Sequence, residues 1–293
     1  MSKAILVDTT KCISCRACQV ACKQSHNLPA ERTYIEGRKT AFQNPIALSA
    51  KTMTMVTQNE IEDPRAPGGL KWVFAKRQCM HCESPACASA CPVTALHKTK
   101  EGPVNYDKAK CLGCRYCVWA CPFGVPTAQW DSLAPQIVKC TMCYERITDT
   151  EAPAAELNGT PLTGDPQARI AAGFKLPACV KTCTTGCLQF GDRDALIAEA
   201  KKRMAGAPDK YINHIYGETE AGGTCYIYIS NVPFEKIGFR TDLGSRGYPS
   251  YSAVQMGAVA PAVIGVGAIL GGIYMLQKRR EEVASKSNQG KKE

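Results

Sequence analysis

The chain has 293 residues, of which 45% are hydrophobic and 21% charged, so its composition is that of a folded protein and not of a disordered one. Its formal net charge is +10, yet no basic run with interleaved aromatic residues lies outside the cysteine motifs, and we expect no nucleic-acid partner. The chain also contains 18 cysteines, at short repeated spacings that favour metal ligation over long-range disulfides.

Sixteen of the cysteines form four groups of four. The first and third groups have the spacing C-x2-C-x2-C-x3-C of bacterial ferredoxins, and the second widens the middle gap to four residues. The last group is split, because "KCTMCYERI" holds only two cysteines and two more follow in "PACVKTCTTGC". In chain order the groups are Cys12, Cys15, Cys18 and Cys22; Cys79, Cys82, Cys87 and Cys91; Cys111, Cys114, Cys117 and Cys121; Cys140, Cys143, Cys179 and Cys183.

These four groups predict four [4Fe–4S] clusters with four cysteine ligands each. In such spacings three thiolates of a group hold one cluster, and the fourth crosses to the neighbouring cluster. The second and third groups are close in sequence and predict one double-cluster module over residues 79–121. That module is then inserted within a second module, made of residues 12–22 and 140–183. The expected fold is α+β, with two interlocked ferredoxin-like modules in a domain of residues 1–240.

The positive charge has a ready explanation in these clusters. A [4Fe–4S] core with four thiolates carries roughly 2−, so four of them offset about eight of the ten excess positive charges. Several lysines and arginines lie within a few residues of a cysteine, among them Lys11, Arg16 and Lys139. We therefore interpret the basic residues as compensation for buried cluster charge.

The segments around the first three groups carry strand and turn patterns. "LSAKTMTMVTQ" (48–58) and "LKWVFAKRQC" (70–79) are rich in threonine, valine and aromatic residues, which predicts strands. Between Cys91 and Cys111 there is room for a short helix and a strand pair. Residues 148–168 are rich in proline, glycine and alanine and predict a surface insertion.

Beyond the last group, "DRDALIAEAKKRMAG" (192–206) predicts a helix. Its residues Leu196, Ile197, Ala200 and Met204 fall on one face, and Asp192 or Asp194 is expected to cap its start. The run "TCYIYIS" (224–230) predicts a strand.

Two cysteines and the histidines remain outside the ligand count. Cys187 and Cys225 are expected to be small buried hydrophobic residues. Cys187 is also an alternative ligand to Cys183, which is followed by Thr184 instead of proline. His81 lies inside "CMHC", where no ligand is missing, so we expect it beside the cluster ligands or facing solvent. No histidine forms a recognisable catalytic pattern.

The C-terminal region predicts a membrane anchor. After a linker (241–252), residues 253–277 include 21 consecutive uncharged residues, Met256–Leu276, which are enough to span a bilayer as a helix. Gly267 and Gly271 form a GxxxG pair that favours packing against a partner helix. The basic tail (278–293) predicts a cytoplasmic C-terminus and a cluster domain on the outer face. Because "MSKAILVDTTKC" enters the first motif without a signal peptide, we expect a partner to carry the domain across.

Taken together, "CRACQVACK", "CMHCESPAC", "NYDKAKCLGCRYCVWACPFGVP", "KCTMCYERI" and "PACVKTCTTGCLQFG" resemble the four-cluster iron–sulfur subunits of molybdopterin oxidoreductase complexes. Within that family the chain is most similar to the beta subunits of membrane-bound formate dehydrogenases, over about residues 4–235 and in the terminal span. The resemblance implies four cluster-binding sets. They are Cys12, Cys15, Cys18 and Cys183; Cys22, Cys140, Cys143 and Cys179; Cys79, Cys82, Cys87 and Cys121; Cys91, Cys111, Cys114 and Cys117.

The resemblance also implies a function without catalysis by this chain. A molybdenum- or tungsten-pterin catalytic subunit would pass electrons through the four clusters to a membrane cytochrome b and quinone. That subunit's signal would carry both proteins to the periplasmic side of the inner membrane. Two features depart from the family pattern: the insertion after Cys143 is long, and Thr184 replaces the usual proline.

Two alternatives stay open. The relay subunit of a membrane-bound nickel–iron hydrogenase also has four clusters and a C-terminal anchor, and other molybdopterin oxidoreductases are weaker versions of this alternative. A zinc-stabilised binding module built on CxxC pairs belongs to another class, but zinc sites do not need a fourth cysteine three residues on. The neighbouring catalytic chain and the metal content would discriminate between these functions.

Overall fold

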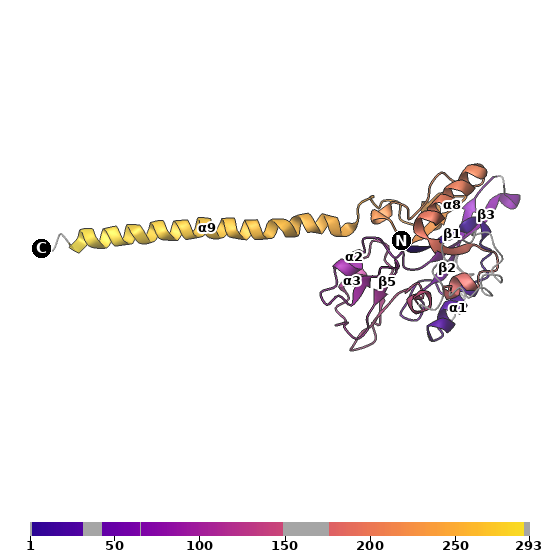
Figure 1. Ribbon diagram of the computed structural model, residues 1–293, viewed down its shortest axis with the longest axis horizontal. Coiled ribbons are helices and arrows are strands. Elements are labelled where there is room, and N and C mark those ends of the chain that lie inside the picture. Colours follow the sequence, from indigo (N-terminus) through magenta and orange to yellow (C-terminus); the bar gives the residue numbers. More distant parts are fainter. Residues whose placement is uncertain (1, 32–42, 65, 149–175, 290–293) are drawn as a thin grey trace. The chain divides into compact units, whose positions relative to one another are not determined.

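The computed structural model describes residues 2–31, 43–64, 66–148 and 176–289. The chain divides into two units, Met1–Tyr248 and Pro249–Glu293 (Figure 1). In the described part of the first unit, short helices alternate with one three-stranded and three two-stranded sheets. The described residues of the second unit all lie in helix α9 (Tyr248–Gln289). The mixed α+β class and the terminal helix predicted from the sequence are confirmed.

The central sheet brings the two ends of the first unit together. Strand β1 (Lys3–Asp8) lies between β8 (Leu188–Asp192), which is antiparallel to it, and β9 (Tyr226–Ile229), which is parallel. All of β9 and nearly all of β1 are buried, as expected for a strand pair covered on both faces. Cys12 follows β1, and Cys183 precedes β8. Because Val7 pairs with Leu188, the sheet brings the first and last cysteine groups side by side.

The segment before the second group forms a hairpin. Strand β2 (Met55–Glu62) pairs with β3 (Leu70–Arg77), and β3 leads directly to Cys79. The prediction of a strand over 70–79 is confirmed. The strand predicted over 48–58 begins only at Met55, because residues 49–52 form a tight turn closed by backbone bonds between Ser49 and Thr52.

A second hairpin separates the second group from the third. Strands β4 (Leu96–Lys98) and β5 (Val104–Tyr106) pair antiparallel, which confirms the expected strand pair. The short helix expected between Cys91 and Cys111 is wrong, since that fully described stretch contains only the hairpin and turns. The helical turn lies earlier, as α2 (Ala86–Ser89). Strands β6 (Thr127–Ala128) and β7 (Ile137–Val138) then lead to Cys140.

Helix α8 (Arg193–Gly206) covers the central sheet and matches the predicted helix. Leu196 and Ala200 are buried, and Ile197 and Met204 pack against the same core. The expected cap is wrong in its detail. Asp192 occupies the N-cap position but makes no capping hydrogen bond, because its carboxylate pairs with Lys3 at 2.7 Å.

The cysteine groups start short helices that pack in pairs. Helix α1 (Ala17–Ser25) lies against α7 (Ala178–Lys181), and α2 lies against α3 (Tyr116–Ala120). Helix α4 (Tyr144–Ile147) follows Cys143. In the described part of the chain, 3-10 segments follow at Thr9–Lys11, Pro67–Gly69, Glu220–Gly222 and Phe234–Ile237. The predicted surface insertion lies almost wholly outside the described residues.

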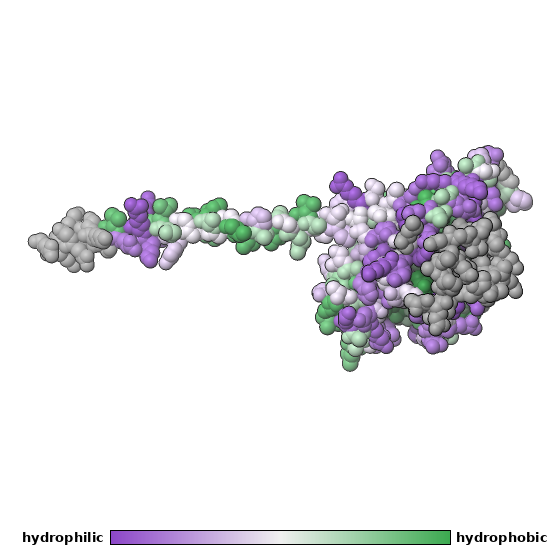
Figure 2. All heavy atoms as spheres, viewed as in Figure 1, coloured by the Kyte–Doolittle hydropathy of each residue, from purple (hydrophilic) through white to green (hydrophobic). Residues whose placement is uncertain are grey.

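Helix α9 (Tyr248–Gln289) is continuous through Pro261. Its segment Tyr248–Ala284 is 37 residues long, with a mean hydropathy of 2.0 in its most apolar window, and none of that window is buried within this chain. Figure 2 shows hydrophobic residues along much of the helix and hydrophilic ones nearer its C-terminal end. By length and composition α9 is able to cross a membrane.

Candidate functional site: four groups of cysteines

The loop between the first two cysteines of each group has the same unusual backbone conformation. The residue before the second cysteine has a positive φ in every loop: Ser14 (57°), His81 (50°), Gly113 (72°) and Met142 (57°). A left-handed conformation costs an ordinary L-residue roughly 1–2 kcal/mol, so three of these loops hold their shape against local preference. Loops of this kind present successive backbone N–H groups to one concave side, which suits an anion such as an iron–sulfur cluster.

The first group and the end of the last group meet beside the central sheet. Cys12, Cys18 and Cys183 interact electrostatically with one another, although Cys183 is far away in sequence. Cys15 lies exposed in the same loop as Cys12. The structure thus brings together the sulfurs on the two sides of the β1–β8 pair.

A second gathering lies deeper, and all four of its cysteines are buried. It contains Cys22, Cys140, Cys143 and Cys179, and the first of these interacts with all three others. Polar hydrogens point at its sulfurs: the Met142 N–H donates to Cys140 Sγ at 3.3 Å, and the Ala178 N–H donates to Cys143 Sγ at 3.4 Å. The Tyr226 hydroxyl lies 3.9 Å from Cys140 Sγ. Such donors stabilise thiolates over thiols.

The second and third groups produce two further gatherings. Cys82 interacts with Cys79, Cys87 and Cys121, the last of which comes from the third group. Burial raises the pKa of the Cys121 thiol, and the nearby backbone N–H groups of residues 123–125 oppose this effect. Cys117 interacts with the remaining sulfurs, namely Cys91, Cys111 and Cys114. In each pair of groups, therefore, one cysteine of each group lies with the sulfurs of the other group.

Burial opposes the thiolate form that a metal requires. Burial raises the pKa of the thiols of Cys18, Cys87 and Cys143 to about 12. Two buried lysines, Lys76 and Lys139, supply opposing positive charge, and no ion pair joins either of them to a carboxylate among the described residues. Converging sulfurs, inward N–H groups and unpaired buried cations fit anionic iron–sulfur clusters.

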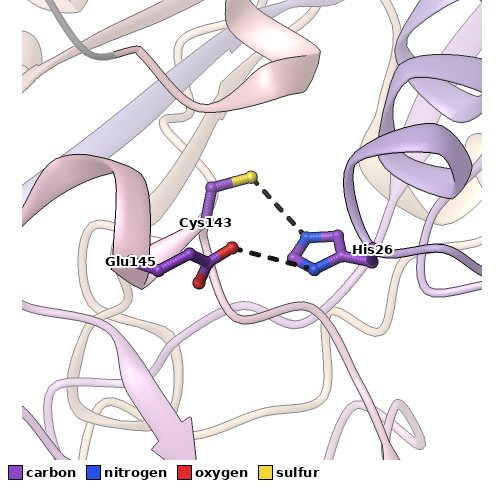
Figure 3. A group of neighbouring side chains, drawn as sticks. All are labelled: His26, Cys143 and Glu145. Carbon is purple, nitrogen blue, oxygen red and sulfur yellow. Dashed lines mark hydrogen bonds and ion pairs between the residues drawn. The ribbon is translucent and has the colours of Figure 1, made fainter.

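A histidine contacts one of the buried sulfurs. Figure 3 shows His26, at the end of α1, with Nε2 3.7 Å from Cys143 Sγ and Nδ1 3.8 Å from Glu145 Oε1. The three side chains have the donor types of a mononuclear metal site. Cys143, however, already belongs to the buried gathering. The ring therefore suits a hydrogen-bond donor to that sulfur better than a further metal ligand.

The structure also places the residues that the sequence left open. His81 is fully buried, so a solvent-facing position is wrong. Its Nδ1 accepts the Val104 N–H at 2.9 Å, and its Nε2 has no partner among the described residues. Cys187 and Cys225 are buried as expected. Neither is an inert hydrophobic residue, because Cys225 donates to Glu83 Oε1 at 2.9 Å and Cys187 lies close enough to Cys12 and Cys183 to lower the pKa of both thiols.

The position of Cys187 makes its role as a reserve ligand testable. The Cys187 thiol lies near both Cys12 and position 183, so in Cys183→Ala we expect it to supply the missing sulfur and to keep the iron content near that of the unaltered chain. In the double variant Cys183→Ala/Cys187→Ala, we expect about four irons to be lost. Iron and acid-labile sulfide per chain measure this. Cys187→Ala alone serves as the control and should lose nothing. Equal losses in the single Cys183 variant and in the double variant would contradict the prediction.

The fold and the sulfur geometry define an iron–sulfur protein of the double-cluster ferredoxin class. The comparisons with known proteins agree. Residues 11–95 match one model of a 4Fe-4S dicluster domain, and residues 70–158 match another. Two such domains give four [4Fe–4S] clusters, as the cysteine count predicts.

Three relatives show the same relationship over most of the chain. A protein of Nitratidesulfovibrio vulgaris is 39% identical over 286 residues, which cover 97% of this chain and 69% of the relative. The Hydrogenase-2 operon protein HybA of Escherichia coli O157:H7 is 32% identical, over 95% of this chain and 84% of its own length. The iron–sulfur subunit of the nitrate-inducible formate dehydrogenase of Escherichia coli K12 is 32% identical, over 77% of this chain and 67% of its own length. The chain therefore belongs to the family of 4Fe-4S dicluster iron–sulfur subunits of oxidoreductase complexes, and it is an electron-transfer subunit.

Proposed function

We propose that sixteen cysteines hold the clusters in four sets and that the chain relays electrons from a formate dehydrogenase catalytic subunit to a membrane acceptor. The clusters supply one-electron transfer, and the chain spaces them, buries them and sets their potentials. The gatherings of sulfurs support the assignment. Set one is Cys12, Cys15, Cys18 and Cys183; set two is Cys22, Cys140, Cys143 and Cys179; set three is Cys79, Cys82, Cys87 and Cys121; set four is Cys91, Cys111, Cys114 and Cys117.

The observation that carries this proposal is the continuous order of the sets. Cys18 of set one interacts with Cys179 of set two. Cys79 of set three packs with Cys140 of set two around Val125. Set three meets set four where Cys87 and Cys117 share a small buried cluster. Each set thus adjoins the next, which is the arrangement that stepwise electron transfer requires.

Only the two ends of this line contain exposed cysteines. Cys15 of set one and Cys114 of set four are exposed, whereas no cysteine of sets two and three is. Large apolar side chains are exposed beside both ends, with Ile13 62% exposed near set one and Leu112 and Trp119 71% and 81% exposed near set four. Exposed apolar groups around a site typically mark a docking surface. These features support entry of electrons at one end and exit at the other.

The two exposed ends of the line suit two different partners. One end would meet a molybdenum- or tungsten-pterin catalytic subunit, and the other a membrane acceptor such as a cytochrome b or quinone-reactive subunit. The positive residues after the apolar stretch favour a cytoplasmic tail, and hence a periplasmic first unit anchored in inner-membrane lipid by α9.

The nested module arrangement is part of the same proposal. Helix α1, from the first group, packs on α7 of the last group, while α2 and α3 of the middle groups pack on each other. This pairing supports a module of residues 79–121 inserted within a module of residues 12–22 and 140–183. The first unit would then be one electron-transfer domain up to about residue 240, followed by a linker (241–252), the span 253–277 and the basic tail.

The relay subunit of a membrane-bound hydrogenase is a second candidate function. The match to HybA covers 95% of this chain, against 77% for the formate dehydrogenase subunit, at the same identity. The catalytic partner distinguishes the two functions, because one carries molybdenum or tungsten and the other nickel and iron.

Purification of the tagged full chain from native membranes tests the proposal. We expect a large subunit to copurify with molybdenum or tungsten, and formate to reduce the clusters in the complex. Nickel in the copurifying subunit, with reduction of the clusters by hydrogen, would establish the hydrogenase relay instead. Absence of iron and acid-labile sulfide from the chain would overturn both functions.

A further inference from the structure

Among the lysines and arginines of the described residues, only two have buried side chains. Lys76, on β3, is 2% exposed, and Lys139, between β7 and Cys140, is 3% exposed. Neither has an ion-pair partner among the described carboxylates, although the chain contains 26 acidic residues. An uncompensated buried charge is strongly destabilising, so a compensating negative charge is expected close to each ammonium.

A closed set of hydrogen bonds holds the Lys76 ammonium in place. Its Nζ donates to Gln78 Oε1 at 2.8 Å, and the Gln78 amide donates to the Tyr228 hydroxyl at 2.5 Å. That hydroxyl donates in turn to the Lys76 carbonyl at 2.9 Å. The ammonium also lies 5.2 Å from the centre of the Tyr226 ring. Gln78 and Tyr226 are neutral, so these contacts orient the charge without cancelling it.

The two lysines act mainly on different sulfurs. The charge of Lys76 acts on Cys18 of set one and on Cys22, Cys140 and Cys179 of set two. Burial acts to lower the pKa of the Lys76 ammonium, but the charges of Cys179, Cys18 and Cys140 outweigh burial and raise that pKa, which keeps the group cationic. Lys139 instead acts on Cys79, Cys87 and Cys121 of set three. Its ammonium donates to the carbonyls of Val104 and Cys140.

We propose that Lys76 and Lys139 are positioning residues for electron transfer, with Lys76 raising the reduction potentials of the clusters in sets one and two and Lys139 raising that of the cluster in set three. The inference rests on the proposed ligand sets. Reduction adds a negative charge to a cluster, and a fixed cation in a medium of low dielectric stabilises the reduced form more than the oxidised one. Each half of the line would thus have its own buried charge.

Potentiometric titration followed by low-temperature paramagnetic resonance tests the proposal on the full chain in its complex. In Lys76→Met we expect the reduction potentials of the clusters in sets one and two to fall by at least ~59 mV. This corresponds to a tenfold decrease in the equilibrium constant for one-electron reduction. The potentials of sets three and four should stay unchanged. In Lys139→Met we expect the largest fall in set three and a smaller one in set two, because Lys139 also lies beside Cys140. Lys76→Arg keeps the positive charge, so the potentials of sets one and two should stay close to those of the unaltered chain.

Two further variants make the outcome specific. Lys202→Met removes an exposed lysine of α8, whose charge solvent screens, and should move no potential. Cys179→Ser and Cys82→Ser, which each empty one set, assign the signals to sets two and three. If Lys76→Met does not assemble its clusters, Lys139→Met carries the same test independently.

The results separate a failure of this inference from a failure of the proposed ligand sets. Lysine variants with full iron content and unchanged potentials would overturn the role of the buried charges while leaving the relay intact. Ligand variants that retain every signal would overturn the assignment of the sets instead. A uniform shift of all four potentials in either lysine variant would also contradict the proposal, because the two charges act mainly on different sets.

Discussion

Cys179→Ser is expected to empty set two, so that the iron content of the chain falls from about sixteen to about twelve atoms. Cys179 is buried among Cys22, Cys140 and Cys143, and a serine hydroxyl is a poor substitute for a thiolate at iron. Iron and acid-labile sulfide per chain, together with the loss of one paramagnetic signal, measure the effect.

Cys225→Ser is the matched control for this prediction. Cys225 is as deeply buried as Cys179, but it hydrogen-bonds with Glu83 and Lys98 and belongs to no proposed set. We expect this variant to keep about sixteen irons. An equal loss of iron in both variants would mean that burial of the thiol, and not ligation, is what matters.

The same Cys179 variant interrupts the relay. Set two lies between sets one and three in the line of sulfur groups. We expect electron transfer from the catalytic partner to quinone to be lost in the complex, while the partner continues to reduce a soluble dye. Retention of quinone reduction would show that electrons bypass the line and would contradict the proposed order of the sets.

Truncation of the chain after Gly247 is expected to move most of it from the membrane fraction to the soluble fraction. The segment removed includes the 37-residue apolar part of α9, none of whose most apolar window is buried within this chain. Transfer of a helix of this length and composition from water into the bilayer core is strongly favourable. Fractionation followed by alkaline extraction of the membranes measures the distribution.

Substitutions within α9 separate anchoring from partner binding. Gly267→Leu/Gly271→Leu keeps the helix apolar and should leave the chain in the membrane fraction. The bulky side chains would close the small-residue face, so we expect the membrane partner to copurify less. If the truncated chain stays in the membrane fraction to the same extent as the full chain, the contacts of the first unit are what hold it there.

Sequence patterns correctly predicted the features that depend on residues close together in the chain. The spacing of cysteines within each group identified the clusters, because a tight loop must aim three sulfurs at one body. Helix α8 and strand β3 followed from periodicity and composition. The short helix expected before Cys111 was wrong, because the chain there needed only a hairpin to connect the two groups. The Asp192 cap was wrong because a distant residue, Lys3, took its carboxylate.

The sequence by itself determined the class of cofactor, the number of clusters and the apolar terminal helix, since each depends on residues that are neighbours in the chain. Tertiary structure decided what depends on residues far apart. Only the pairing of β1 with β8 brings Cys12 to Cys183 and Cys187, and only burial isolates Lys76 and Lys139 from carboxylates. The spacing of the cysteines selects the cofactor because neighbouring sulfurs must reach the same cluster. The reduction potentials and the order of the four sets depend instead on charges and sulfurs that the fold brings together from distant parts of the chain.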